Sequence, residues 1–192
     1  MATYTGILND LVITSPRTFV LAPKQIRADK ELVLAAVKRN GWSLAYASDT
    51  LKDDFDIVLA AVQHGGDALA YASDTLKANF DIVLAAVTYS GTNLNDASRE
   101  LRSNRKIVLT AVRQNGFSLS AASNELKNDR EVVLAAVTNY GRALRYASPE
   151  LRSNREIVLT AVREDESAIE FASFRLQNDP EIRKFADLEI RL

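Results

Sequence analysis

The chain has 192 residues, of which 24 are Lys or Arg, 25 are Asp or Glu, one is His and none is Cys. With 47% hydrophobic and 26% charged residues, it has the composition of a folded globular protein and not of a disordered one. The lack of cysteine excludes disulfides, thiolate nucleophiles and cysteine-ligated metal sites, and apolar runs of at most six residues are too short for the roughly 20 that cross a bilayer.

Residues 1–28 precede the first full copy of an internal repeat and are predicted to form a degenerate N-terminal capping repeat. Ile7 and Val12 keep apolar positions of that repeat, whereas Asn9 and Asp10 replace core residues. The stretch does not combine a basic start with a long apolar segment, so we expect no signal peptide. We therefore expect a cytoplasmic protein, with secretion by a signal-independent route as the alternative.

Residues 29–178 consist of six tandem copies of a 25-residue repeat with no insertion. The string V-L-A/T-A-V begins at Val33, Val58, Val83, Val108, Val133 and Val158. One copy has about seven large apolar side chains, worth roughly 1.5 to 3 kcal/mol each, which cannot offset the entropy of ordering its residues. Stacked neighbours must supply the remainder. We predict an all-α fold, a right-handed α-solenoid that forms one continuous domain.

Each repeat is predicted to open with a long helix of about ten residues. An Asp or Asn suited to the N-cap precedes every apolar run, at Asp29, Asp54, Asn79, Asn104, Asp129, Asn154 and Asp179. Acidic residues such as Glu131 follow in the first turn, where they favour the positive end of the helix dipole. The helix is predicted to end at a recurring glycine in the left-handed conformation, which becomes Glu166 in the last copy.

A short second helix and a single capped turn complete the predicted repeat. The second helix holds a leucine and an alanine, as in the segment from Trp42 to Ala47. A recurring serine is predicted to cap the final turn, and Pro149 directly after Ser148 is typical of a first helical position. The serines are Ser48, Ser73, Ser98, Ser123, Ser148 and Ser173.

Residues 179–192 are predicted to form a C-terminal capping helix. Pro180 follows Asp179, as expected for the first helical position. Arg183 and Lys184 replace a valine and a leucine of the repeat, which suits an end on which no further copy stacks. Lys184 nevertheless fits this scheme poorly.

The full pattern, D-x-E-I-V-L-A-A-V-x-x-x-G-x-A-L-x-Y-A-S-x-x-L-K, resembles a family of tandem helical repeats of unknown function. The resemblance extends from Asp29 to Asn178. It implies an interaction role and carries no catalytic residue over to this chain. Asp96 and Ala121 replace the usual tyrosine, and Glu166 replaces the glycine.

The side chains that could perform chemistry favour a structural interpretation. Six serines share one context, but a nucleophilic serine needs a base, and His64 is the only histidine. The acidic residues recur once per helix, about 10 Å apart if the helices pack side by side, which is too far for chelation. We therefore expect no enzyme activity, no cofactor and no metal site.

Charge is distributed unevenly along the chain, with a net charge of −5 over residues 29–98 and +6 over residues 99–163. Basic residues recur in register within the second segment, at Arg105, Arg130 and Arg155, at Arg113 and Arg163, and at Arg142 between them. Stacked in rows, they would offer stripes to an acidic partner or to nucleic acid, or would pair with neighbouring glutamates. Lys52 and Lys77 share the register of Arg102 within the acidic segment, which favours a structural role for that row.

The residues on either side of each repeat glycine and the residue after each recurring serine differ between copies, and all of them are expected to cluster along one rim. We call the positions next to the glycine the variable rim. Trp42, Tyr89, Phe117 and Tyr140 are its aromatic members and are expected to act as interface anchors. We predict a non-catalytic protein-interaction or scaffolding module, and sequence-tolerant nucleic-acid binding through residues 99–163 as the alternative. We expect a protein partner, no membrane and a monomer, with self-association through an imperfect cap as the alternative. The candidate partner-binding residues are Trp42, Tyr89, Arg105, Arg113, Phe117, Arg130, Tyr140, Arg142, Arg155 and Arg163.

Overall fold

The computed structural model describes residues 19–186, and every regular element in that range is a helix. A ten-residue α-helix opens each of the six repeats, as predicted. These long helices are α4 (Lys30–Arg39), α6 (Phe55–His64), α8 (Phe80–Tyr89), α9 (Arg105–Gln114), α11 (Arg130–Asn139) and α12 (Arg155–Glu164).

Two short elements follow each long helix, in the predicted order. The first is a six-residue 3-10 helix: η1 (Gly41–Tyr46), η2 (Gly66–Tyr71), η3 (Gly91–Asp96), η5 (Gly116–Ala121), η6 (Gly141–Tyr146) and η8 (Glu166–Phe171). The second is a single turn: α5 (Asp49–Lys52), α7 (Asp74–Lys77), η4 (Leu101–Ser103), α10 (Asn124–Lys127), η7 (Leu151–Ser153) and α13 (Phe174–Gln177).

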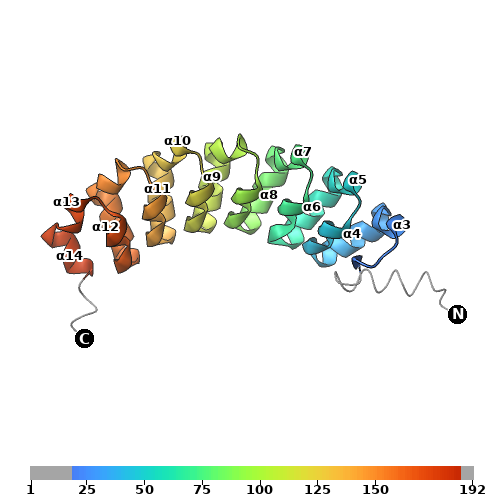
Figure 1. The fold of residues 1–192 in the computed structure, drawn as a ribbon, viewed down its shortest axis with the longest axis horizontal. Coiled ribbons are helices and arrows are strands. Elements are labelled where there is room, and N and C mark those ends of the chain that lie inside the picture. Colours follow the sequence, from blue (N-terminus) through green and yellow to red (C-terminus); the bar gives the residue numbers. More distant parts are fainter. Residues whose placement is uncertain (1–18, 187–192) are drawn as a thin grey trace, which may run out of the picture. The chain divides into compact units, whose positions relative to one another are not determined.

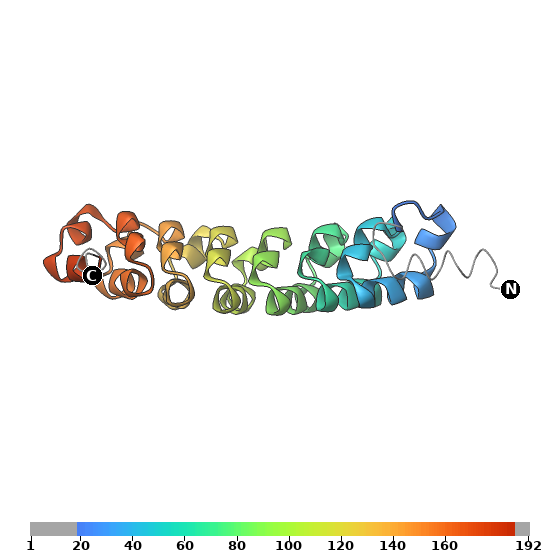
Figure 2. The same cartoon turned by 90° about the horizontal axis from the view of Figure 1, so that it is seen from below.

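The described residues fall into two compact units, 19–89 with 96–98 and 90–95 with 99–186. Within each unit consecutive long helices lie side by side, α4, α6 and α8 in the first and α9, α11 and α12 in the second (Figure 1). The long helices of a unit form one layer and its short elements form another (Figure 2). The repeat solenoid is thus confirmed. None of the described helices is both long enough and apolar enough to cross a membrane.

The core of each unit lies between these two layers. In α6 the side chains of Ile57, Val58 and Val62 have no exposed surface, and neither does Leu69 in the following 3-10 helix. The same registers are buried in the other repeats, for example at Ile107. Each such side chain contributes about 1.5 to 3 kcal/mol to folding, and only because the adjacent repeat covers it.

The predicted N-caps are confirmed, and the serine caps are confirmed in part. The Asp54 carboxylate accepts hydrogen bonds from the backbone N–H groups of Asp56 and Ile57, at 3.1 and 3.2 Å. Serine hydroxyls accept from the N–H three residues ahead at Ser73, Ser123 and Ser148. Ser48 and Ser173 make no such bond.

The predicted left-handed glycine at the end of the long helix is wrong. No glycine in the described range has a positive φ, and Gly41 begins η1 instead, after Asn40 in extended conformation. Glycine is needed there because the next repeat touches it: a Cβ at Gly116 would lie 2.3 Å from the carbonyl oxygen of Ala136. The position is set by close approach of two backbones and not by local conformation.

The two predicted caps are described only in part. Residues 1–18 of the N-terminal cap and residues 187–192 of the C-terminal cap lie outside the described range. The short helix α3 (Lys24–Arg27) stands at the register of the final turn of a repeat, and α14 (Pro180–Ala186) begins at Pro180 as predicted. Lys184 is exposed on α14. It occupies the register of Leu109, which is buried, and of Leu134 and Leu159, which are half-buried, so it replaces a residue that neighbouring repeats cover in those copies.

Candidate functional site

Two aromatic residues of the variable rim are held against the next repeat. The Trp42 ring meets Tyr71 edge-on, with 5.7 Å between centroids, and Phe117 meets Tyr146 in the same way at 5.6 Å. Trp42 and Phe117 nevertheless remain exposed, with 44% and 41% of their surface accessible to solvent. Each ring is therefore oriented by the next repeat and still presents an apolar surface to solvent.

The other two aromatic candidates lie close by in the repeat but differ in exposure. Tyr89 is the last residue of α8 and is exposed, whereas Tyr140 joins α11 to η6 and is half-buried. A Cβ added at Gly116 would lie 2.8 Å from the Cβ of Tyr140, so Tyr140 packs on that glycine. Trp42 and Tyr89 belong to the first compact unit, and Phe117 and Tyr140 to the second.

The backbone N–H of the repeat glycine is bonded by a side chain that sequence analysis did not identify. Gly91 donates to Gln114 Oε1 at 2.6 Å, and Gly116 donates to Asn139 Oδ1 at 2.6 Å. Gly141 donates to Glu164 at the equivalent position. In these three repeats the acceptor is the last residue of the next long helix. Its changing identity hid this shared role, because Gln, Asn and Glu supply the same oxygen.

The arginines at the start of the long helices are bound to carboxylates of the next repeat. Arg105 donates from Nε to Asp129 at 2.9 Å and from Nη2 to Glu131 at 2.5 Å. Arg130 forms an ion pair with Glu156, and Arg155 forms one with Glu181. We call Arg105, Arg130 and Arg155 the long-helix arginine row. Of the two interpretations left open by the sequence, this geometry favours pairing with neighbouring glutamates.

The pairing alters the titration of its members. Hydrogen bonds from Arg105 lower the pKa of the Asp129 carboxyl, and the N–H of Val132 adds to the effect. In the first unit, a hydrogen bond to Asp54 raises the pKa of Lys30, which occupies the register of Arg105. Because the Arg105 side chain is 48% exposed, solvent screens the pair, which therefore contributes little to stability.

The three remaining basic candidates also contact their own chain. Arg113 lies 3.3 Å from Glu131, the carboxylate that binds Arg105. The Arg163 guanidinium lies over the Phe185 ring, 4.7 Å from its centroid. Arg142 lies over Phe171 at 5.8 Å. Their charges are thus partly engaged within the second unit.

A ladder of backbone hydrogen bonds joins each serine to the preceding repeat. The N–H of Ser73 donates to the carbonyl of Lys52 at 2.9 Å, and that of Ser123 donates to Arg102 at 3.0 Å. The same bond recurs at Ser48, Ser98, Ser148 and Ser173. The accepting residues, which we call the turn basic row, are Arg27, Lys52, Lys77, Arg102, Lys127 and Arg152.

The side chains of the turn basic row are half-buried where the chain is described. The Nε atoms of Arg27, Arg102 and Arg152 are buried and have no hydrogen-bond partner. The row therefore differs from the long-helix arginine row, whose guanidinium groups are hydrogen-bonded to carboxylates.

The side chains considered for catalysis occupy structural positions. His64 Nδ1 bonds the carbonyl of Ala60 at 2.9 Å, within its own helix. The Ser148 hydroxyl accepts from Leu151 N–H and donates to Asn128 at 2.6 Å. Among the described residues, no three His, Cys, Asp or Glu side chains come together as metal ligands would.

The family model described as "Domain of unknown function (DUF4116)" matches residues 29–77, 79–127, 104–152 and 154–186. These ranges begin at equivalent points of the 25-residue repeat and together cover most of the chain. Searches of curated proteins and of solved structures found no match. The repeated match in register shows that the chain belongs to the DUF4116 family of tandem repeats.

Proposed function

We propose that this chain is a non-catalytic protein-binding module that contacts its partner through the variable rim. The observation that carries the proposal is the state of Trp42 and Phe117. Both rings are largely exposed, yet each is oriented by a tyrosine of the next repeat. Large aromatic side chains held in one orientation lose little entropy on binding and are typical of interface anchors.

The architecture supports a binding role because it separates the constant from the variable positions. Gly116 and its equivalents set the spacing of the backbones, and the apolar registers form the core. The exposed residue after each of those glycines, such as Phe117, can then change without disturbing either. A solenoid of this kind presents a different side chain from each copy along one extended surface.

Nucleic-acid binding has less support. The long-helix arginine row, one of the two basic rows that could follow a phosphate backbone, is already paired with carboxylates. A nucleic acid would have to displace Asp129 and its equivalents before it could bind there. A cytoplasmic location remains part of the proposal.

The proposal is tested by capturing a partner from the native cell extract and measuring its binding to purified variants. We expect Phe117→Ala to weaken binding at least tenfold, about 1.4 kcal/mol. Phe174→Ala is the matched control, because Phe174 is 82% exposed and lies on a final turn away from the rim. That variant should bind within about twofold of the original chain.

The salt dependence of the same binding separates the two functions. Protein binding through aromatic anchors should change little between 50 and 200 mM salt, whereas phosphate contacts would lose affinity steeply. Steep salt dependence together with no effect of Phe117→Ala would overturn the proposal.

A further inference from the structure

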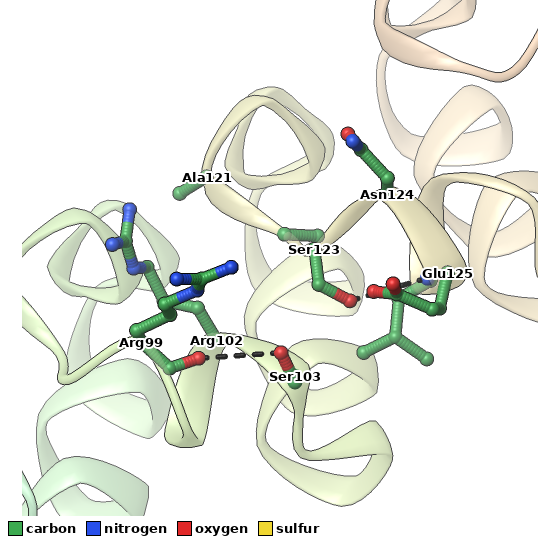
Figure 3. Close-up of a pocket in the computed structure, with 9 residues that line it drawn as sticks. Arg99, Arg102, Ser103, Ala121, Ser123, Asn124 and Glu125 are labelled. Atoms are coloured by element: carbon green, nitrogen blue, oxygen red, sulfur yellow. Dashed lines mark hydrogen bonds between the residues drawn. The ribbon is translucent and has the colours of Figure 1, made fainter.

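A pocket of about 520 Å³ lies at the turn basic row of the second unit, between the third and fourth repeats. Its lining includes Arg99, Arg102, Ala121, Ser123 and Asn124 (Figure 3). The two arginines come from the end of the third repeat, and the other three residues come from η5, α10 and the link between them. In Figure 3 both guanidinium groups point to the side on which Ala121 lies.

The positive charge of this pocket is not balanced in the way that the long-helix arginine row is. Neither Arg99 nor Arg102 forms an ion pair within 4 Å of a described carboxylate, and Arg102 Nε is buried without a hydrogen-bond partner. Lys127, the next member of the turn basic row, lies close enough to Arg102 that this charge, together with burial, lowers the pKa of Lys127.

The nearest acidic lining residue is engaged elsewhere. Glu125 lies beyond Ser123 from the guanidinium groups in Figure 3. Hydrogen bonds from its own N–H and from Ser123 lower the pKa of Glu125, and Arg99 contributes less. The carboxylate is therefore held by its own turn and does not neutralise Arg102.

The residue at the tyrosine register explains why this pocket is larger than its counterpart in the first unit. In the repeats an aromatic residue stands 19 positions after the turn basic row, at Tyr46, Tyr71, Tyr146 and Phe171. Ala121 occupies that register opposite Arg102 and removes the ring. A pocket of about 410 Å³ at the same register of the first unit is lined by Tyr46 and Asp49 where the larger one has Ala121 and Asn124.

The first unit shows which group suits this place. Asp96 occupies the tyrosine register and lies near Lys77, the cation of the turn basic row. Burial raises the pKa of Asp96, while the charge of Lys77 favours the ionised carboxylate. In the first-unit pocket that Tyr46 lines, the carboxylate of Asp49 lies 3.9 Å from the ammonium group of Lys52. At both places the chain itself supplies a carboxylate to the row.

We propose that the pocket between Arg99 and Arg102 binds a carboxylate side chain from an acidic segment of a protein partner. The partner's Asp or Glu would take the place that Asp96 holds beside Lys77. Two guanidinium groups can bind one carboxylate through parallel N–H donors, and the space left by Ala121 admits the side chain. This inference rests on the proposed protein-binding function and adds a second contact to the variable rim.

The test measures fluorescence anisotropy of labelled hexaglutamate with the full chain, with hexaglutamine as the uncharged probe. Ala121→Tyr restores the residue found in three other repeats, so it should fold normally and fill the space beside Arg102 that a carboxylate side chain would occupy. Ala121→Asp places the carboxylate of Asp96 beside the arginines. We expect each variant to weaken hexaglutamate binding at least tenfold, whereas Arg175→Gln, an equal loss of charge in the same unit, should change it less than twofold.

Nuclear magnetic resonance of the ¹⁵N-labelled chain locates the site independently. Hexaglutamate should shift the Arg102 Nε–H and the amide signals of Ser123 and Asn124 in the original chain, and not in Ala121→Tyr. Equal binding of hexaglutamine, unchanged binding by Ala121→Tyr, or shifts centred elsewhere would overturn the inference. Binding of a phosphoserine peptide at these signals without binding of hexaglutamate would also overturn it, in favour of a phosphate site.

The two proposals fail in different ways. Phe117→Ala should leave hexaglutamate binding unchanged, because Phe117 does not line the pocket. If Ala121→Tyr loses hexaglutamate binding while Phe117→Ala leaves partner binding unchanged, carboxylate binding in the pocket is supported and partner binding through the variable rim is rejected. The reverse pattern would retain the rim and reject the pocket.

Discussion

The two ends of the long helices join neighbouring repeats by different means. At the C-terminal end, the glycine end, two backbones touch, and the space beside Gly116 is too small for a single methyl group. At the N-terminal end, the serine end, repeats are joined by the serine N–H ladder and by charged side chains. The pockets lined by Arg102 and by Arg27 lie at the serine end.

The glycine end therefore matters most for stability, whereas the serine end offers space for a ligand. The glycine end sets the distance between repeats, so its backbone tolerates little change, and only the outward side chains can vary. The serine end is joined by the serine N–H ladder, but its half-buried basic side chains leave space between repeats, and that space is larger where Ala121 replaces a ring.

The largest expected effect comes from adding a methyl group at the glycine end. Gly116→Ala should destabilise the second unit by about 3 kcal/mol, because its Cβ would overlap the carbonyl of Ala136. Urea unfolding followed by circular dichroism measures the loss. Glu166→Gly is the control, since this copy already carries a side chain at the same register, and it should cost about 1 kcal/mol or less. Equal losses in the two variants would contradict the steric explanation.

A smaller effect is expected from removing the side-chain acceptor at the glycine end. Asn139→Ala leaves the buried N–H of Gly116 without its partner and should cost about 1 to 2 kcal/mol in unfolding free energy. Asn139→Gln should retain most of the stability, because Gln114 performs this task for Gly91. If Gln is no better than Ala there, the hydrogen bond is not the cause.

At the serine end, Ser148→Ala should cost about 1 kcal/mol. It removes the cap on Leu151 N–H and the hydrogen bond to Asn128, but keeps the backbone bond to Lys127. Ser173→Ala is the matched control, since its hydroxyl is buried and unpartnered, and it should be close to neutral. Thermal unfolding of the two variants side by side gives the comparison.

The smallest effect concerns the ion pair of Asp129 with Arg105. The folded state lowers the pKa of Asp129, so the ion pair stabilises the protein fully at pH values above the ordinary aspartate pKa of about 3.9. This stabilisation is lost as pH falls through the lower pKa of the folded state. Asp129→Asn keeps an N-cap acceptor and should cost about 0.5 kcal/mol at pH 7. The gap in unfolding free energy should narrow as pH falls below that ordinary value. A gap that stays constant with pH would exclude the charge as its source.

The sequence predicted the helices well because their signals are local. Asp54 and Asn154 cap helices through hydrogen bonds to residues two and three positions ahead, so their role is visible in a short stretch of chain. The repeat period likewise predicted that Ile57 and Leu69 would be buried by neighbouring copies. Both inferences need only a pattern and the helix period.

The sequence could not decide what each recurring residue touches in the next copy. Gly116 matched the signature of a left-handed helix end as well as that of a close approach, and only the position of Ala136 distinguishes them. The arginines at 105 and 102 both recur in basic registers, yet only Arg105 meets a carboxylate of the next repeat. Those contacts join residues about 19 to 26 positions apart.

The 25-residue sequence repeat therefore determined the helices, their N-caps and the need for stacking. These features follow from hydrogen bonds and burial within one or two copies. The tertiary structure alone decided which charges are neutralised and where a cavity opens. Those properties depend on the distances between side chains of successive repeats, which the repeat pattern alone does not give.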